Sequence, residues 1–236
     1  MTSISKNARF AGLIYLLLTV VAPFRLIYIP GKLFVSGDAQ ATANNVAAHA
    51  SLFQLGITSD LLTGAISLFL TFTLYRLFRD VNKNWALLML MLGFMDTPLY
   101  FFNVWNDAAA LTLARGANFL SAFDQPQRNA LAMLFLHLHG QVIVFSEIFW
   151  GLWLFPLAVL VFRSGFLSRF LGVWLAINGL AYLVLSFTGL WLPNYEDAVS
   201  SVAFPCQLGE IVFMLWLLVM GAKARPPIAG KSSLAQ

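Results

Sequence analysis

Charged residues are scarce in this chain of 236 residues: only 10% are Asp, Glu, Lys or Arg, whereas soluble domains carry roughly 25%. This shortage excludes an ordinary soluble domain. Hydrophobic residues make up 60% of the chain and the mean hydropathy is +0.79, so the composition predicts a membrane protein. Cysteine is also nearly absent. The single Cys206 can form no disulfide within the chain and gives no information about the redox compartment.

Six segments are long and apolar enough to cross a hydrocarbon core of roughly 30 Å, which takes about 20 residues of helix. They cover about 9–29, 53–78, 85–105, 143–162, 170–192 and 202–222. Because these segments use most of the chain, we expect one domain over 1–236. The predicted fold is an all-α bundle of six transmembrane helices, with an additional extracytoplasmic or interfacial helical segment within 107–142. Residues 223–236 are expected to form a flexible cytoplasmic tail.

The positions of Lys and Arg predict the orientation, because positively charged loops tend to remain in the cytoplasm. Ten of the fourteen basic residues fall at the N-terminus, in the loops after the second and fourth segments, and in the C-terminal tail. We therefore expect both termini to be cytoplasmic. This distribution also accounts for the net charge of +4, so it indicates no nucleic-acid partner.

The fourth apolar segment is expected to begin well before the membrane. Asp124 is a suitable N-cap, Gln127 completes a capping pair and Pro126 suits the first helical turn. A helix from there to Phe162 would be about 55 Å long, which exceeds the hydrocarbon thickness. It must therefore protrude, tilt or break, and Gly140 is the expected breaking point.

The stretch FLHLHGQVIVFSE, residues 135–147, places two histidines and a glutamate in this segment. Residues two apart on a helix point about 200° apart, so His137 and His139 cannot both bind one metal ion. Zinc needs three or four ligands, and the remaining candidates are Glu147, His49 and aspartates of other segments. We predict no metal and no cofactor; His139, Glu147 and His49 are the candidates should a metal bind. The histidines are interpreted as residues at the mouth of the bundle, bonded to loop carbonyls or water.

Four carboxylates fall inside the apolar segments: Asp60, Asp96, Glu147 and Glu210. An ionisable side chain in a bilayer costs roughly 2.5–3.5 kcal/mol and usually faces the interior of the bundle. Two interpretations stay open. The acids could form structural pairs with Arg25, a tyrosine or one another, or they could line a polar cavity that opens outward.

For the second interpretation we expect an acidic and aromatic pocket facing the outside, since small-molecule sites are mostly apolar with a few convergent polar groups. The candidate pocket residues are Arg25, Asp60, Asp96, Tyr100, His139, Glu147, Tyr182 and Glu210.

Six stretches, in chain order, are similar to a known bacterial family. They read RFAGLIYLLL (9–18), SGDAQATANNVAAHASLFQLGITSDLL (36–62), LYRLFRDVNK (74–83), FLSAFDQPQRNALAMLFLHLHG (119–140), VFRSGFLSRFLGVWLAINGLAYL (161–183) and GEIVFMLWLLVMG (209–221). Together they resemble the integral-membrane family catalogued as domain of unknown function number four-three-eight-six.

The resemblance implies a multi-pass protein of a bacterial cytoplasmic (inner) membrane, and it carries no particular activity. The positions that match the family pattern are Gly37, Asp38, Asp60, His139, Gly140, Arg163, Gly165, Gly172, Tyr182, Glu210 and Trp216. His137 departs from the pattern, which has an acidic or small polar residue there, and this weakens any mechanism built on a histidine pair.

Three functions of different classes are compatible with these observations. We favour a protein that binds, transports or senses a small amphiphilic or cationic ligand, or a proton, with the lipid bilayer as its other partner. The alternative is an intramembrane hydrolase that uses a metal or acid and base groups, although no HExxH motif is present and no catalytic residue can be named. The second alternative is a scaffold or assembly subunit whose buried polar groups only hold helices together.

Overall fold

A computed structural model describes residues 3–222, and within them every regular element is a helix. Six helices or runs of helices are long and apolar enough to cross a membrane. The six-helix membrane bundle expected from the sequence is therefore confirmed. The predicted tail at 223–236 lies outside the described residues.

Most spans begin or end at other residues than the sequence predicts. The first span comprises α1 (Ser3–Pro23), the π-helical η1 (Phe24–Tyr28) and α2 (Ile29–Leu33). The next four spans are α4 (Ala50–Phe78), α5 (Lys83–Arg115), α6 (Gln125–Arg163) and α7 (Arg169–Trp191). The sixth comprises η3 (Pro193–Tyr195), α8 (Glu196–Leu215) and the π-helical η4 (Trp216–Met220). Two short elements, α3 (Ala39–Ala48) and η2 (Asn118–Leu120), lie between spans.

The helical segment expected within 107–142 is formed by the ends of α5 and α6, not by a separate helix. Helix α6 begins at the predicted capping box, in which Asp124 and Gln127 each accept the other's backbone N–H. It then continues for 39 residues without interruption. Of the three alternatives for this long segment, a break at Gly140 is therefore excluded, and protrusion or tilt remains. A lone glycine weakens a helix by only about 1 kcal/mol relative to alanine, which the packing of a long helix readily outweighs.

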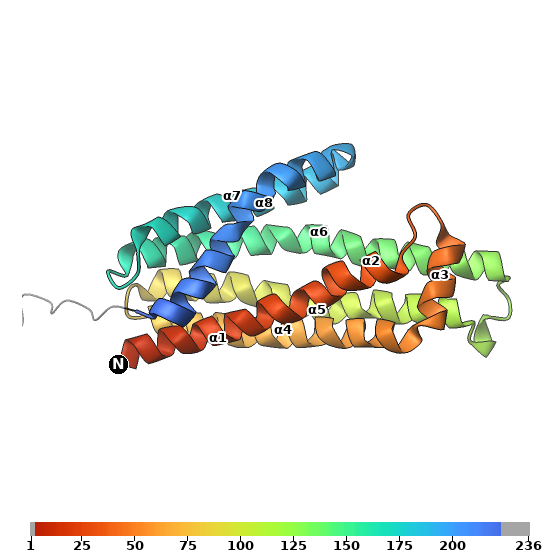
Figure 1. Cartoon of the computed structure of the whole chain (residues 1–236), viewed down its shortest axis with the longest axis horizontal. Coiled ribbons are helices and arrows are strands. Elements are labelled where there is room, and N and C mark those ends of the chain that lie inside the picture. The colour runs from red at the N-terminus through yellow and green to blue at the C-terminus, as the bar shows by residue number, and fades with distance from the viewer. Residues whose placement is uncertain (1–2, 223–236) are drawn as a thin grey trace, which may run out of the picture.

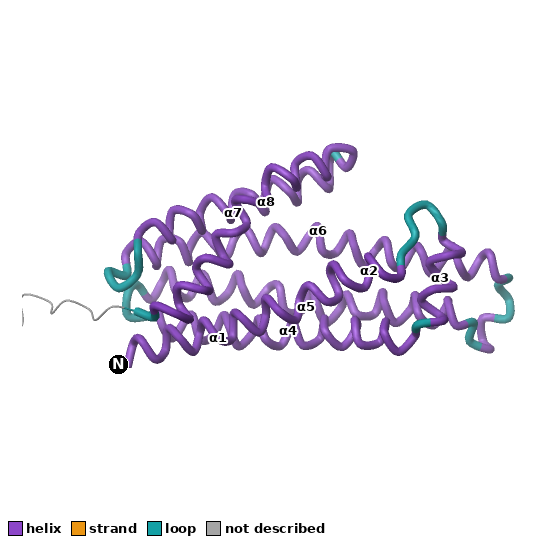
Figure 2. The backbone as a smooth tube through the Cα atoms, in the orientation of Figure 1, coloured by secondary structure: helices purple, strands orange, loops and turns teal. Residues whose placement is uncertain are grey.

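The two halves of the bundle contain different helices. Helices α1, α4, α5 and α6 run side by side along the long axis, and α7 and α8 form a hairpin over one half of it (Figure 1). At the other end the short helix α3 crosses the bundle and packs against α5 and α6. Most connecting loops lie at the two ends of the bundle, whereas the connection between α7 and α8 lies near the middle of its length (Figure 2). The far half of α6 is thus supported mainly by α5, and α3 adds a contact near its end.

Helix α7 lies against α6 at a contact made by small residues. A Cβ on Gly179 would lie 2.8 Å from the carbonyl oxygen of Gly151, and one on Gly151 would lie 2.6 Å from that of Gly179. Ser186, two turns further along α7, donates to the Val144 carbonyl at 2.6 Å. Small residues allow membrane helices to approach this closely. This contact fixes the hairpin over residues 144–162 of α6.

Candidate functional sites

The first buried polar group begins at the π-helical turn of the first span. In η1 the Ile29 N–H bonds the Phe24 carbonyl five residues back, and such turns often occur at functional sites. The turn carries Arg25, which is 2% exposed. Its Nε and Nη2 donate to the two carboxylate oxygens of Asp107 on α5, at 2.7 and 2.6 Å. This is a bidentate ion pair, the geometry in which Arg binds carboxylates most strongly.

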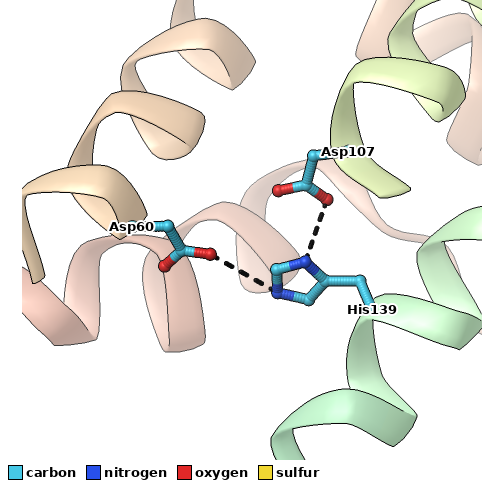
Figure 3. A group of neighbouring side chains, drawn as sticks. All are labelled: Asp60, Asp107 and His139. Atoms are coloured by element: carbon cyan, nitrogen blue, oxygen red, sulfur yellow. Dashed lines mark ion pairs between the residues drawn. The ribbon is translucent and has the colours of Figure 1, made fainter. Parts of the chain in front are cut away.

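His139 of α6 lies between two carboxylates (Figure 3). Its Nδ1 is 3.3 Å from Asp107 Oδ1, and its Nε2 is 3.7 Å from Asp60 Oδ2 on α4. Asn103 of α5 donates to the His139 carbonyl at 3.2 Å. We call Arg25, Asp60, Asp107 and His139 the polar cluster. It joins the first four spans.

Several polar atoms of this cluster are buried without a hydrogen-bond partner. Among residues 3–222 these are both carboxylate oxygens of Asp60 and both ring nitrogens of His139. Asp60 is fully buried and His139 is 3% exposed. One ligand atom from each of Asp60, Asp107 and His139 can be chosen so that all three lie within 4.8 Å of one another. Buried polar atoms are rarely left unpaired, so this arrangement points to a bound species.

The second site is a pocket to which all six spans contribute. It has a volume of about 220 Å³. Its polar and aromatic lining consists of Tyr15, Thr19, Thr63, Ser67, Asp96, Tyr100, Trp150, Trp153, Tyr182, Gln207 and Glu210. No Lys, Arg or His is among the residues that line it. We call it the acidic pocket.

The two carboxylates of the acidic pocket are held by neutral donors. Glu210 of α8 accepts hydrogen bonds from the Tyr15 hydroxyl of α1 and, at 3.3 Å, from Asn178 Nδ2 of α7. Asp96 Oδ1 of α5 accepts from Trp150 Nε1 of α6 at 2.7 Å. Neutral donors orient a carboxylate without cancelling its charge. An ionised acid in this pocket would therefore still attract a cation.

Aromatic rings form much of the remaining wall. The Tyr100 ring stacks on Trp150 with a centroid separation of 6.5 Å, and Tyr182 meets Trp150 edge-on at 5.7 Å. These contacts link α5, α6 and α7. The three rings thus line the same pocket as the carboxylates of Asp96 and Glu210.

The structure divides the predicted pocket residues between the two sites. Asp96, Tyr100, Tyr182 and Glu210 line the acidic pocket, whereas Arg25, Asp60 and His139 belong to the polar cluster. Asp96 and Asp107 are separated by about three turns of α5, roughly 16 Å, and His139 and Trp150 by a similar length of α6.

Glu147 belongs to neither site: it is half-buried on α6 and is absent from the pocket lining. Of the three residues named for a metal, only His139 lies in a group of possible ligands within residues 3–222. His49 is exposed, and its Nδ1 lies 3.1 Å from the Asn45 carbonyl.

Asp107 is the residue of the polar cluster that was not among the candidates from the sequence, since it lies just beyond the third apolar segment, which was expected to end near residue 105. The available signal was spacing. Asp96, Tyr100, Asn103 and Asp107 follow one helix face at intervals of four, three and four residues, and all four are buried. Extending that face by one turn would have placed Asp107 in the bundle.

Three comparisons with known proteins bear on identity. The family model described as "Domain of unknown function (DUF4386)" matches residues 10–221. An uncharacterized protein of Archaeoglobus fulgidus is 31% identical over 85 residues, which are 35% of this chain and 48% of that protein. The chain thus spans about half the length of the curated relative it matches. No solved structure matches. Because the family model covers most of the chain, the protein belongs to the DUF4386 family, as the resemblance of its sequence motifs predicted.

Proposed function

We propose that the acidic pocket binds a small organic cation that carries an apolar part, and that the protein transports or senses this ligand. The observation that carries the proposal is the lining itself, which has two carboxylates and several aromatic rings but no basic side chain. An anion would find no counter-charge there. A cation would be attracted by the two carboxylates, and its apolar part could pack against the aromatic rings.

Aromatic rings next to carboxylates are the chemistry that recognises ammonium groups. A cation over the face of Trp or Tyr gains about 0.5–2 kcal/mol, most when water is excluded, and aromatic cages bind quaternary ammonium ligands in this way. Trp150 is fixed by its bond to Asp96 and by its contacts with Tyr100 and Tyr182. The rings are therefore held in place before a ligand arrives.

The size of the pocket limits the ligand. At about 220 Å³ it lies below the roughly 300–1,000 Å³ of drug-sized sites. A quaternary or primary ammonium with a few carbon atoms suits this volume. Part of the polarity comes from Thr63 and Ser67, which can accept or donate to a hydroxyl on such a ligand.

We further propose that the ligand enters from outside the cell, which requires both the orientation expected from the basic residues and a pocket that opens outward. With both termini in the cytoplasm of a bacterial inner membrane, the positively charged loops face inward. An acidic pocket opening outward would then collect cations from outside the cell.

The proposal is tested by comparing cations with neutral molecules of the same shape. Purified full-length protein in detergent is titrated calorimetrically with choline and with 3,3-dimethylbutan-1-ol, in which carbon replaces the ammonium nitrogen. Tetraethylammonium and benzyltrimethylammonium extend the range of size. We expect at least one cation to bind, and choline to bind at least about tenfold better than the neutral alcohol.

Variants identify the site. Asp96→Asn keeps the shape of the side chain and should weaken cation binding while leaving neutral binding unchanged. Asp80→Asn is the matched control, because Asp80 is 72% exposed in a loop and should have no effect. If none of the cations binds, or if the cation and the alcohol bind equally well, the proposal is wrong and the scaffold function becomes the better explanation.

A further inference from the structure

We propose that Asp60, Asp107 and His139 form a binding site for one divalent transition-metal ion of the zinc class, separate from the acidic pocket. The three side chains come from α4, α5 and α6, and the His139 ring lies between the two carboxylates (Figure 3). One possible ligand atom from each residue lies within 4.8 Å of the other two.

The geometry is that of a site slightly larger than a bound ion requires. Ligands around zinc lie about 2.0–2.2 Å from the metal, which puts neighbouring ligand atoms roughly 3.3 Å apart. His139 Nδ1 and Asp107 Oδ1 are already 3.3 Å apart, and the chosen set of three ligand atoms fits within 4.8 Å. Asp107 approaches Nδ1 of His139 and Asp60 approaches Nε2, so binding one ion requires the imidazole ring or the Asp60 carboxylate to reorient until both acids approach the same nitrogen. The three protein ligands would then leave a fourth position for water.

The charges of the polar cluster favour binding of a cation over binding of an anion. Arg25 forms its bidentate ion pair with Asp107, so those two charges offset each other. Asp60 has no such partner: among the described residues its nearest basic group is His139, at 3.7 Å. A fully buried carboxylate without compensation is unfavourable, whereas a buried charge that coordinates a metal is stable.

The unpartnered atoms are independent evidence for a ligand. Both oxygens of Asp60 and both nitrogens of His139 lack a hydrogen-bond partner within residues 3–222. One oxygen of Asp60 points toward Nε2 of His139, and Nδ1 of the same ring points toward Asp107 (Figure 3). These two approaches, at 3.7 and 3.3 Å, are ion-pair distances if His139 is protonated, but neither is a hydrogen bond. The hydrogen-bonding capacity of Asp60 and of the imidazole is therefore left for a ligand.

The imidazole determines which metals fit. Carboxylates alone suit Mg²⁺ and Ca²⁺, whereas an imidazole nitrogen favours Zn²⁺, Fe²⁺, Ni²⁺ or Cu²⁺. The surroundings also match those of metal ligands, which are commonly held by outer hydrogen bonds. Arg25 holds Asp107, whose oxygens retain a second lone pair, and Asn103 holds the His139 backbone.

The test measures metal binding to the full-length protein, purified in detergent without a histidine tag and stripped with chelator. Zn²⁺, Co²⁺ and Mg²⁺ are titrated by calorimetry, and elemental analysis counts bound zinc after desalting. We expect one zinc per chain and much weaker binding of Mg²⁺. The variants His139→Gln and Asp60→Asn should each bind zinc at least about tenfold more weakly, since even outer-sphere changes reduce metal affinity 10- to 100-fold.

Two exposed histidines provide matched controls. His137 lies on the opposite, exposed face of the same helix, and His49 is exposed on the chain before α4, so His137→Gln and His49→Gln should leave zinc affinity unchanged. Loss of binding in these controls, unchanged binding in His139→Gln, or no binding of any transition metal by the wild type would each overturn the proposal.

A measurement on the wild type covers the case in which a variant fails to fold. X-ray absorption at the zinc edge should show oxygen and nitrogen ligands with the scattering of a single imidazole. Two or more imidazoles, or a sulfur ligand, would exclude this site. The result is independent of the choline experiment, because Asp96→Asn changes the acidic pocket and should leave zinc binding intact.

Discussion

Breaking the ion pair between Arg25 and Asp107 should destabilise the bundle strongly, whereas replacing both residues should not. The two hydrogen bonds are 2.6 and 2.7 Å long, and the side chains are 2% and 0% exposed. Removing one partner of such a pair leaves an unpaired buried charge, which costs about 3–5 kcal/mol. We expect Arg25→Met to lower the free energy of unfolding by about that amount.

The two single variants should differ. In Asp107→Leu the remaining guanidinium still lies over the rings of Phe34 and Phe53, at 5.7 and 5.6 Å from their centroids, and the attraction of these rings offsets about 1–2 kcal/mol. In Arg25→Met the carboxylate of Asp107 retains, among residues 3–222, only His139 as a neighbouring base. Arg25→Met should therefore be the more harmful change. The double variant should lie close to the wild type, since an apolar pair of similar volume often replaces a buried ion pair without loss.

The assay is unfolding of the purified protein in mixed micelles by increasing sodium dodecyl sulfate, followed by circular dichroism. Asp80→Asn is the control, because the exposed pair Arg79–Asp80 spans 3.9 Å and such pairs contribute less than about 1 kcal/mol. The reasoning is refuted if Arg25→Met costs less than about 1 kcal/mol. It is also refuted if the double variant loses the sum of the two single effects.

Three further changes test the packing and the capping of α6. Gly179→Ala should lower the free energy of unfolding by about 1–3 kcal/mol, because its new methyl would lie 2.8 Å from the Gly151 carbonyl oxygen. An unchanged free energy in the same detergent assay would contradict the close approach of α6 and α7. Gly140→Ala should stabilise the protein by up to about 1 kcal/mol, because nothing lies within 4 Å of the added carbon, and a loss of stability would show that this glycine is needed. Asp124→Ala should cost about 1 kcal/mol and speed hydrogen exchange at the start of α6, where Gln127 N–H bonds its carboxylate at 2.8 Å; equal exchange in both proteins would rule out the capping role.

The spans were predictable because hydropathy and helix length are local properties of the sequence. The ends of the spans were not, and α5 shows why. Hydropathy places the boundary where polar residues begin, near Asn106 and Asp107, but α5 continues to Arg115. Asp107 is buried because Arg25, from a different span, neutralises it. A pairing between residues 82 positions apart cannot be read from a window of one helix.

The sequence could not predict that the acids belong to two separate sites either. Asp60, Asp96 and Glu210 look alike in sequence, as acids on polar helix faces. Their environments depend on helix register, which sets Asp60 level with His139 and Asp96 level with Trp150. The opposed directions of His137 and His139 did follow from helix geometry alone, and the structure places the first at the surface and the second in the interior.

The contrast between the two sites follows from which spans build them. The four residues of the polar cluster come from the first four spans, which run side by side along the bundle, and their side chains are buried there. The acidic pocket also needs Tyr182 of α7 and Glu210 of α8, and these belong to the hairpin that lies over one half of the bundle. Glu210 is bonded to Tyr15 of α1, so any displacement of the hairpin from α1 would separate one carboxylate of the pocket from the other. Such a displacement could open or close the acidic pocket while leaving the polar cluster unchanged. If the acidic pocket binds the cation that we propose, a response to that ligand would involve the hairpin, because Tyr182 and Glu210 belong to the hairpin and Asp96 does not.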